Sequence, residues 1–119
     1  MSIKRKTAPT EDILVGEGNV FVTVTIGNGH VGSSVVRWVD SDEPLKKGDI
    51  QDLDIGIGKD IAERTLKIVT DINDVHDVAH TITITHDFVN GRPTSIPYVD
   101  AVENDGDSFS LTTTYTFVS

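Results

Sequence analysis

The sequence contains no cysteine, and aromatic residues make up only 6% of it. The absence of thiols excludes a disulfide scaffold, a thiolate-bound zinc or iron–sulfur site and a cysteine nucleophile. Scarce aromatic residues leave no visible platform on which bases could stack. No apolar stretch approaches the roughly 20 residues of a membrane-spanning helix, and the basic N-terminal segment lacks the apolar region of a signal peptide. We therefore expect a soluble protein.

Positive charge is also scarce. Lys and Arg number 10 against 19 Asp and Glu, which gives a net charge of −9. A phosphate backbone is bound by clustered Lys and Arg, and the only basic run, Lys4-Arg5-Lys6, falls in residues 1–12, which we expect to form a flexible arm. The sequence therefore predicts no nucleic-acid partner. Residues 13–119 suffice for a single domain with its own core.

Alternation of apolar and polar residues with a period of two dominates this domain. It is clearest over 18–26, 78–89 and 109–117. Weaker strands are predicted over 53–57, 65–72 and 96–102, and over 33–39, which is nearly continuously apolar apart from Arg37. About seven short strands separated by turns predict an all-β fold, an antiparallel β-sandwich, with a small β-barrel as the alternative. The residues expected in its core are Val22, Val24, Ile26, Leu66, Ile68, Ile82, Ile84, Leu111 and Phe117.

The loops between these segments differ in charge. In an antiparallel arrangement, alternate loops lie at the same end of the sandwich. The glycine-rich loops, predicted at one end, are 27–30, 56–59 and 90–93. The acidic loops, predicted at the other end, are 40–43, 71–77 and 103–107. The sequence thus predicts one anionic end and one weakly cationic end.

The acidic loops suggest a calcium site. Ca²⁺ requires about six to eight oxygen ligands, which Asp and Asn side chains supply. The candidate ligands are Asp71, Asn73, Asp74 and Asp77, with Asp40 and Asp105 as possible neighbours. The same residue types are ordinary turn formers and common on soluble surfaces, and the sequence favours this second interpretation.

Catalytic chemistry has little support in the sequence. His76 and His80 have the spacing of a helical metal pair, but His80 begins a predicted strand. His80 and His86 share a strand face about 20 Å apart, so we expect these histidines to be rim residues with ordinary hydrogen bonds. No nucleophile elbow or phosphate-binding loop is present. We therefore expect a protein that is not an enzyme.

The leading functional hypothesis is a non-catalytic interaction or assembly module, which binds a protein partner or itself. An acidic end and a weakly basic end can stack head to tail into rings or filaments. We interpret the threonine-rich outer faces mainly as solvent positions that favour β-structure. They can also pack on a neighbouring subunit or offer hydroxyls to a sugar, while Trp38 is expected in the core. The alternative is a calcium-dependent or carbohydrate-binding module.

Overall fold

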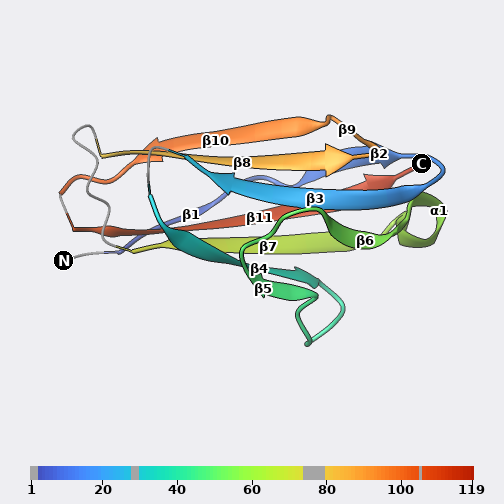
Figure 1. The fold of residues 1–119 in the computed structure, drawn as a ribbon, viewed down its shortest axis with the longest axis horizontal. Coiled ribbons are helices and arrows are strands. Elements are labelled where there is room, and N and C mark those ends of the chain that lie inside the picture. The colour runs from blue at the N-terminus through green and yellow to red at the C-terminus, as the bar shows by residue number, and fades with distance from the viewer. Residues whose placement is uncertain (1–2, 28–29, 74–79, 105) are drawn as a thin grey trace.

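Two β-sheets pack face to face in the computed structural model, which describes residues 3–27, 30–73, 80–104 and 106–119 (Figure 1). In the view of Figure 1, β10, β8 and β3 form the upper layer, and β7, β4 and β5 lie in the lower layer. The described strands do not close into a barrel, so the predicted sandwich is confirmed. No helix in these ranges is long and apolar enough to cross a membrane.

The larger sheet, called sheet A, has the strand order β5-β4-β7-β11-β2-β9, and β1 also pairs with β11. Its strands are β1 (Ile3–Thr7), β2 (Glu11–Val15), β4 (Gly32–Trp38), β5 (Lys46–Gly48), β7 (Thr65–Ile72), β9 (Gly91–Arg92) and β11 (Ser108–Val118). Sheet B has the order β10-β8-β3-β6. Its strands are β3 (Asn19–Ile26), β6 (Leu53–Ile57), β8 (Thr81–Val89) and β10 (Ser95–Ala101), and the short helix α1 (Gly58–Ile61) follows β6.

The N-terminal segment, expected as a flexible arm over 1–12, contains β1 and the start of β2. Both strands pair with β11 in parallel, Ile3 opposite Ser108 and Glu11 opposite Tyr115. The basic run reaches across to sheet B, because Lys4 Nζ and Lys6 Nζ lie 2.6 and 3.3 Å from the carboxylate oxygens of Asp100 on β10.

The core confirms the predicted faces of the clearest strands. Ile82 and Ile84 of β8, together with Leu111 and Phe117 of β11, are at most 1% exposed. Leu66, Ile68 and Val22 are buried as expected, whereas Val24 and Ile26 are only partly buried. The Trp38 ring is also in the core, 5.8 Å from the ring of Phe117 in an edge-on contact. Period-two alternation therefore assigned the inner faces of both sheets.

The predicted sorting of loops by charge is wrong for the 27–30 and 40–43 loops. For the 71–77 and 103–107 loops it agrees with the structure, because Asn73 and Ser108, at their described ends, are hydrogen-bonded (3.4 Å). His30 Nε2 donates a hydrogen bond to the carbonyl of Thr81 (2.8 Å), which places the end of the glycine-rich 27–30 loop beside the start of β8. Val102, which precedes the acidic 103–107 segment, also pairs there, through its amide and the His80 carbonyl (3.0 Å). The acidic 40–43 loop lies elsewhere, because the Val39 amide bonds the carbonyl of Thr65 at the start of β7 (2.9 Å).

The cause of this error is β5, a strand of three residues that the sequence did not predict. Lys46–Gly48 reads as polar loop, yet it pairs with Ser34–Val36 of β4 before the chain crosses to β6 in the other sheet. Because of the additional strand, every later loop lies at the opposite end from the one predicted relative to the first two loops. The 27–30 and 40–43 loops therefore exchange ends.

Candidate functional site

The structure describes three of the predicted calcium ligands, Asp71, Asn73 and Asp40, and only the first two lie close together. Asp71 and Asn73 are exposed at the end of β7, and Asn73 Oδ1 accepts a hydrogen bond from Ser108 Oγ (3.4 Å). Asp40 lies at the opposite end of β7, paired with Arg64 (3.2 Å), so it is not a neighbour of Asp71. The remaining candidates, Asp74, Asp77 and Asp105, lie outside the described residues. Within the described ranges, no three His, Asp or Glu side chains are grouped to hold a metal ion.

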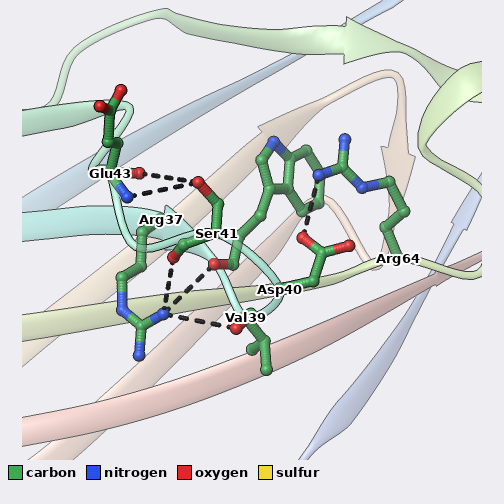
Figure 2. Close-up of polar contacts among 7 residues, drawn as sticks. Arg37, Val39, Asp40, Ser41, Glu43 and Arg64 are labelled. Atoms are coloured by element: carbon green, nitrogen blue, oxygen red, sulfur yellow. Dashed lines mark hydrogen bonds and ion pairs between the residues drawn. The ribbon is translucent and has the colours of Figure 1, made fainter.

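In the acidic 40–43 loop, the side chains of Arg37 and Ser41 bond backbone groups of the loop (Figure 2). Arg37 Nη1 donates to the carbonyls of Trp38 (3.3 Å), Val39 (3.5 Å) and Ser41 (3.0 Å). The Ser41 hydroxyl bonds both the amide and the carbonyl of Glu43 (3.3 and 3.4 Å). These contacts are ordinary turn chemistry, in which a serine hydroxyl replaces a backbone partner.

A cation–π contact stabilises the position of Arg64 beside this loop. The guanidinium carbon lies 4.1 Å from the centre of the Trp38 ring, and Figure 2 shows the Asp40 carboxylate on the same guanidinium. A cation over the face of an indole ring is attracted by its quadrupole. Because Trp38 is only 5% exposed, little of the ring is left to stack on a sugar.

A buried polar network occupies the middle of the sandwich. His86 Nδ1 lies 2.5 Å from the hydroxyl oxygen of Tyr115, which lies 2.9 Å from that of Tyr98. His86 and Tyr115 have no exposed surface, so the expectation that His86 is a rim residue is wrong. Its place on the face shared with Ile82 and Ile84 was the signal for burial. His86 Nε2 has no hydrogen-bond partner among the described residues.

Burial determines the protonation of this network. It lowers the pKa of His86 from 6.5 to about 4, against the opposing charge of Asp87. It also raises the pKa of Tyr115 and that of Tyr98, with the charge of Glu11 adding to both. All three side chains are therefore neutral at neutral pH. His86 and Tyr115 are inaccessible to solvent, so the network is part of the core.

Open cavities lie on the surface of the described residues, and two of them are bordered mainly by polar side chains. One of about 530 Å³ is bordered by Leu14, Glu17, Asn90 and Arg92, with the backbone of nearby residues. The other, about 350 Å³, lies over a row of cross-strand neighbours, Ser33, Asp71, Ser110 and Arg5. Neither lining contains a histidine or a pair of carboxylates.

The outer faces of the two sheets differ in charge. All Lys and Arg residues that lie on strands belong to sheet A: Lys4, Arg5, Lys6, Arg37, Lys46, Lys47, Lys67 and Arg92. The remaining two, Lys59 and Arg64, lie in α1 and just before β7. The strands of sheet B, which the structure describes in full, carry only acidic charges: Asp54, Asp87 and Asp100.

We call Arg37, Lys47 and Lys67 the basic patch. Arg37 and Lys67 are direct partners in the pairing of β4 with β7, and Lys47 is opposite Val35 in the pairing of β5 with β4. Residues directly opposite one another share a face of the sheet. Because Val36 and Ile68, the chain neighbours of these positions, point into the core, the patch is on the outer face.

We call Asp52, Asp54 and Asp87 the acidic patch of sheet B. Asp87 is opposite Thr23 of β3, whose hydroxyl accepts a hydrogen bond from the Asp52 amide (2.9 Å). Asp54 is opposite Phe21 in the pairing of β3 with β6. Its carboxylate accepts hydrogen bonds from Asn19 Nδ2 (3.0 and 3.1 Å) and from the Gly56 amide (2.9 Å). The three residues thus lie around one part of the outer face.

Comparison with protein-family models, with curated proteins and with solved structures finds no match for this chain. The function is therefore argued from the surfaces described above.

Proposed function

We propose that this chain is a non-catalytic assembly module that self-associates through the outer faces of its two sheets. The separation of charge between the sheets carries this proposal, because strand cations occur only in sheet A and sheet B carries only carboxylates. Complementary surfaces of opposite sign steer two proteins together and fix their orientation. A molecule that presents both signs on opposite faces is complementary to its own copies.

The strand edges favour association by faces rather than by edges. The edge strand β5 has three residues, two of them lysines, and β9 has two residues. Pro97 lies within the edge strand β10, where Lys4 Nζ also bonds the carbonyl of Ala101 (2.8 Å). The pairing of β3 with β6 is irregular at Val20 and Phe21. Short strands, lysines, prolines and bulges are the features that prevent edge-to-edge pairing.

Threonine on the outer faces lowers the side-chain conformational entropy that association costs. Outward positions on β11 are Thr112, Thr114 and Thr116, and those on β8 are Thr81, Thr83 and Thr85. Threonine is β-branched and stiff at χ1, so it loses little rotamer freedom when a second surface covers it, unlike Lys, Arg, Gln or Glu. Where threonines form the contact, few rotamers are lost, and the entropy cost is confined to the charged side chains.

Sedimentation velocity over a range of protein concentrations and salt tests the proposal. At about 0.1 M NaCl the Debye length is about 10 Å, and at about 1 M it is about 3 Å. We expect species larger than the 12.9 kDa chain at the lower salt concentration, with dissociation at the higher one. A 12.9 kDa monomer under every condition would contradict self-association, and oligomers that grow with salt would indicate an apolar contact instead.

A further inference from the structure

The basic patch contains an electrostatic conflict. Arg37 and Lys67 are direct cross-strand partners on one face, both partly buried. Like charges directly opposite one another destabilise a sheet. Among the residues that the structure describes, the Arg37 guanidinium is hydrogen-bonded to neutral backbone carbonyls alone, so those contacts do not neutralise it.

No carboxylate within the described ranges forms an ion pair with the basic patch. The ion pairs found there involve Lys4, Lys6 and Arg64. Asp40, close in sequence to Arg37, is engaged by Arg64 instead (3.2 Å). The free chain therefore bears the repulsion between Arg37 and Lys67, and an incoming anionic surface would relieve it.

The acidic patch, in turn, lacks cations to pair with its carboxylates within the described residues. Asp52 and Asp54 are exposed and Asp87 is partly buried, and none of them forms an ion pair with a described residue. The hydrogen bonds to Asp54 come from neutral donors, Asn19 and Gly56, which orient the carboxylate and leave its charge unpaired. Since the strands of sheet B contain no Lys or Arg, a cation must come from elsewhere.

We propose that the basic patch of one copy binds the acidic patch of a second copy. This inference rests on the self-association proposed above and names the two surfaces that meet. The patches lie on the outer faces of different sheets, and hence on opposite sides of the sandwich. Such a contact is heterologous, and each copy keeps one unused patch for a further copy, so the product is a ring or a filament.

Two charge-reversal variants test the pairing. The basic-patch variant is Lys47→Glu with Lys67→Glu, which leaves the Arg37 hydrogen bonds in place. The acidic-patch variant is Asp54→Lys with Asp87→Lys. We expect each variant alone to associate about tenfold or more weakly than the wild type. An equimolar mixture should associate again, because each variant supplies the unchanged patch that the other lacks.

Matched variants control for net charge and for folding. Lys59→Glu with Arg92→Glu changes the net charge as the basic-patch variant does, and Asp42→Lys with Glu43→Lys matches the acidic-patch variant. Both controls should associate like the wild type. Because the Asp54→Lys change removes the hydrogen bonds from Asn19 and Gly56, Asp54→Asn with Asp87→Asn provides a variant of similar shape, which should also weaken association.

The outcomes separate the two proposals. If the wild type associates and the basic-patch variant associates equally well, the pairing of patches is overturned while self-association stands. A mixture of the two reversed variants that remains monomeric also overturns the pairing. A wild type that is monomeric under every condition would refute self-association itself, and with it this inference.

Discussion

His86 should make the protein less stable in mild acid. Its folded-state pKa is lowered to about 4 by burial, whereas an unfolded chain has a histidine pKa of about 6.5. Between these values the unfolded chain binds a proton that the folded chain does not, so the free energy of unfolding decreases as pH falls. The stability is complete above about pH 6.5 and is lost progressively down to about pH 4.

The size of this loss follows from the two pKa values. With a folded pKa of about 4 and an unfolded pKa of 6.5, proton linkage gives a loss of about 2 kcal/mol at pH 5 and about 3 kcal/mol at still lower pH. This is a large share of the stability of a small domain, which is about 5 to 15 kcal/mol.

Urea denaturation at about pH 7.5 and about pH 5 measures this effect, with the fluorescence of Trp38, the single tryptophan, as the signal. The variant His86→Leu removes the titrating ring and keeps an apolar side chain in its place. Its stability should fall less between the two pH values, by about 2 kcal/mol. The control His30→Gln, at a partly buried loop position, should behave like the wild type. An equal loss in wild type and His86→Leu would refute the reasoning.

Three further predictions concern the core, the basic patch and the calcium hypothesis. Ile84→Ala should lower the free energy of unfolding in urea by roughly 2 to 5 kcal/mol, since Ile84 is fully buried; an unchanged midpoint would contradict its place in the core. Lys67→Met should raise the stability of the monomer by up to about 1 kcal/mol by removing the charge opposite Arg37, and a lower urea midpoint would argue against the repulsion. If calcium binds, the melting temperature in CaCl₂ should be higher than in chelator at matched ionic strength, and this difference should vanish in Asp74→Asn. Equal melting temperatures would mean that the acidic loops serve as turns and do not bind calcium.

Strands with a local signal could be predicted from the sequence. In β8 and β11, alternate residues are buried along nearly the whole strand, so the periodicity of one segment reveals its inner face. The strands β1 and β5 carry no such signal, because Lys4, Lys6, Lys46 and Lys47 make them resemble loops. Their structure depends on backbone pairing with other strands, which composition does not reveal.

Predicting the charged patches would have required the strand register as well as the positions of the strands. The sequence marks Arg37 as a break in an apolar run and Lys67 as an outward residue, yet nothing in either segment indicates that they are direct partners. The separation of charge is likewise invisible until each strand is assigned to a sheet. The burial of His86 could have been predicted, because it lies on the same strand face as the buried Ile84 and Phe88, but its polarity suggested an exposed position.

The parallel pairing of β1 and β2 with β11 imposes an order on folding. Ile3 meets Ser108 and Ile13 meets Phe117, so β1 and β2 find their partner only after β11, far later in the sequence, has been synthesised. Closing such long loops costs entropy before any contact repays it, which makes folding slow. Until β11 arrives, β7 also lacks one of its two neighbours, and its exposed edge is a site for aggregation.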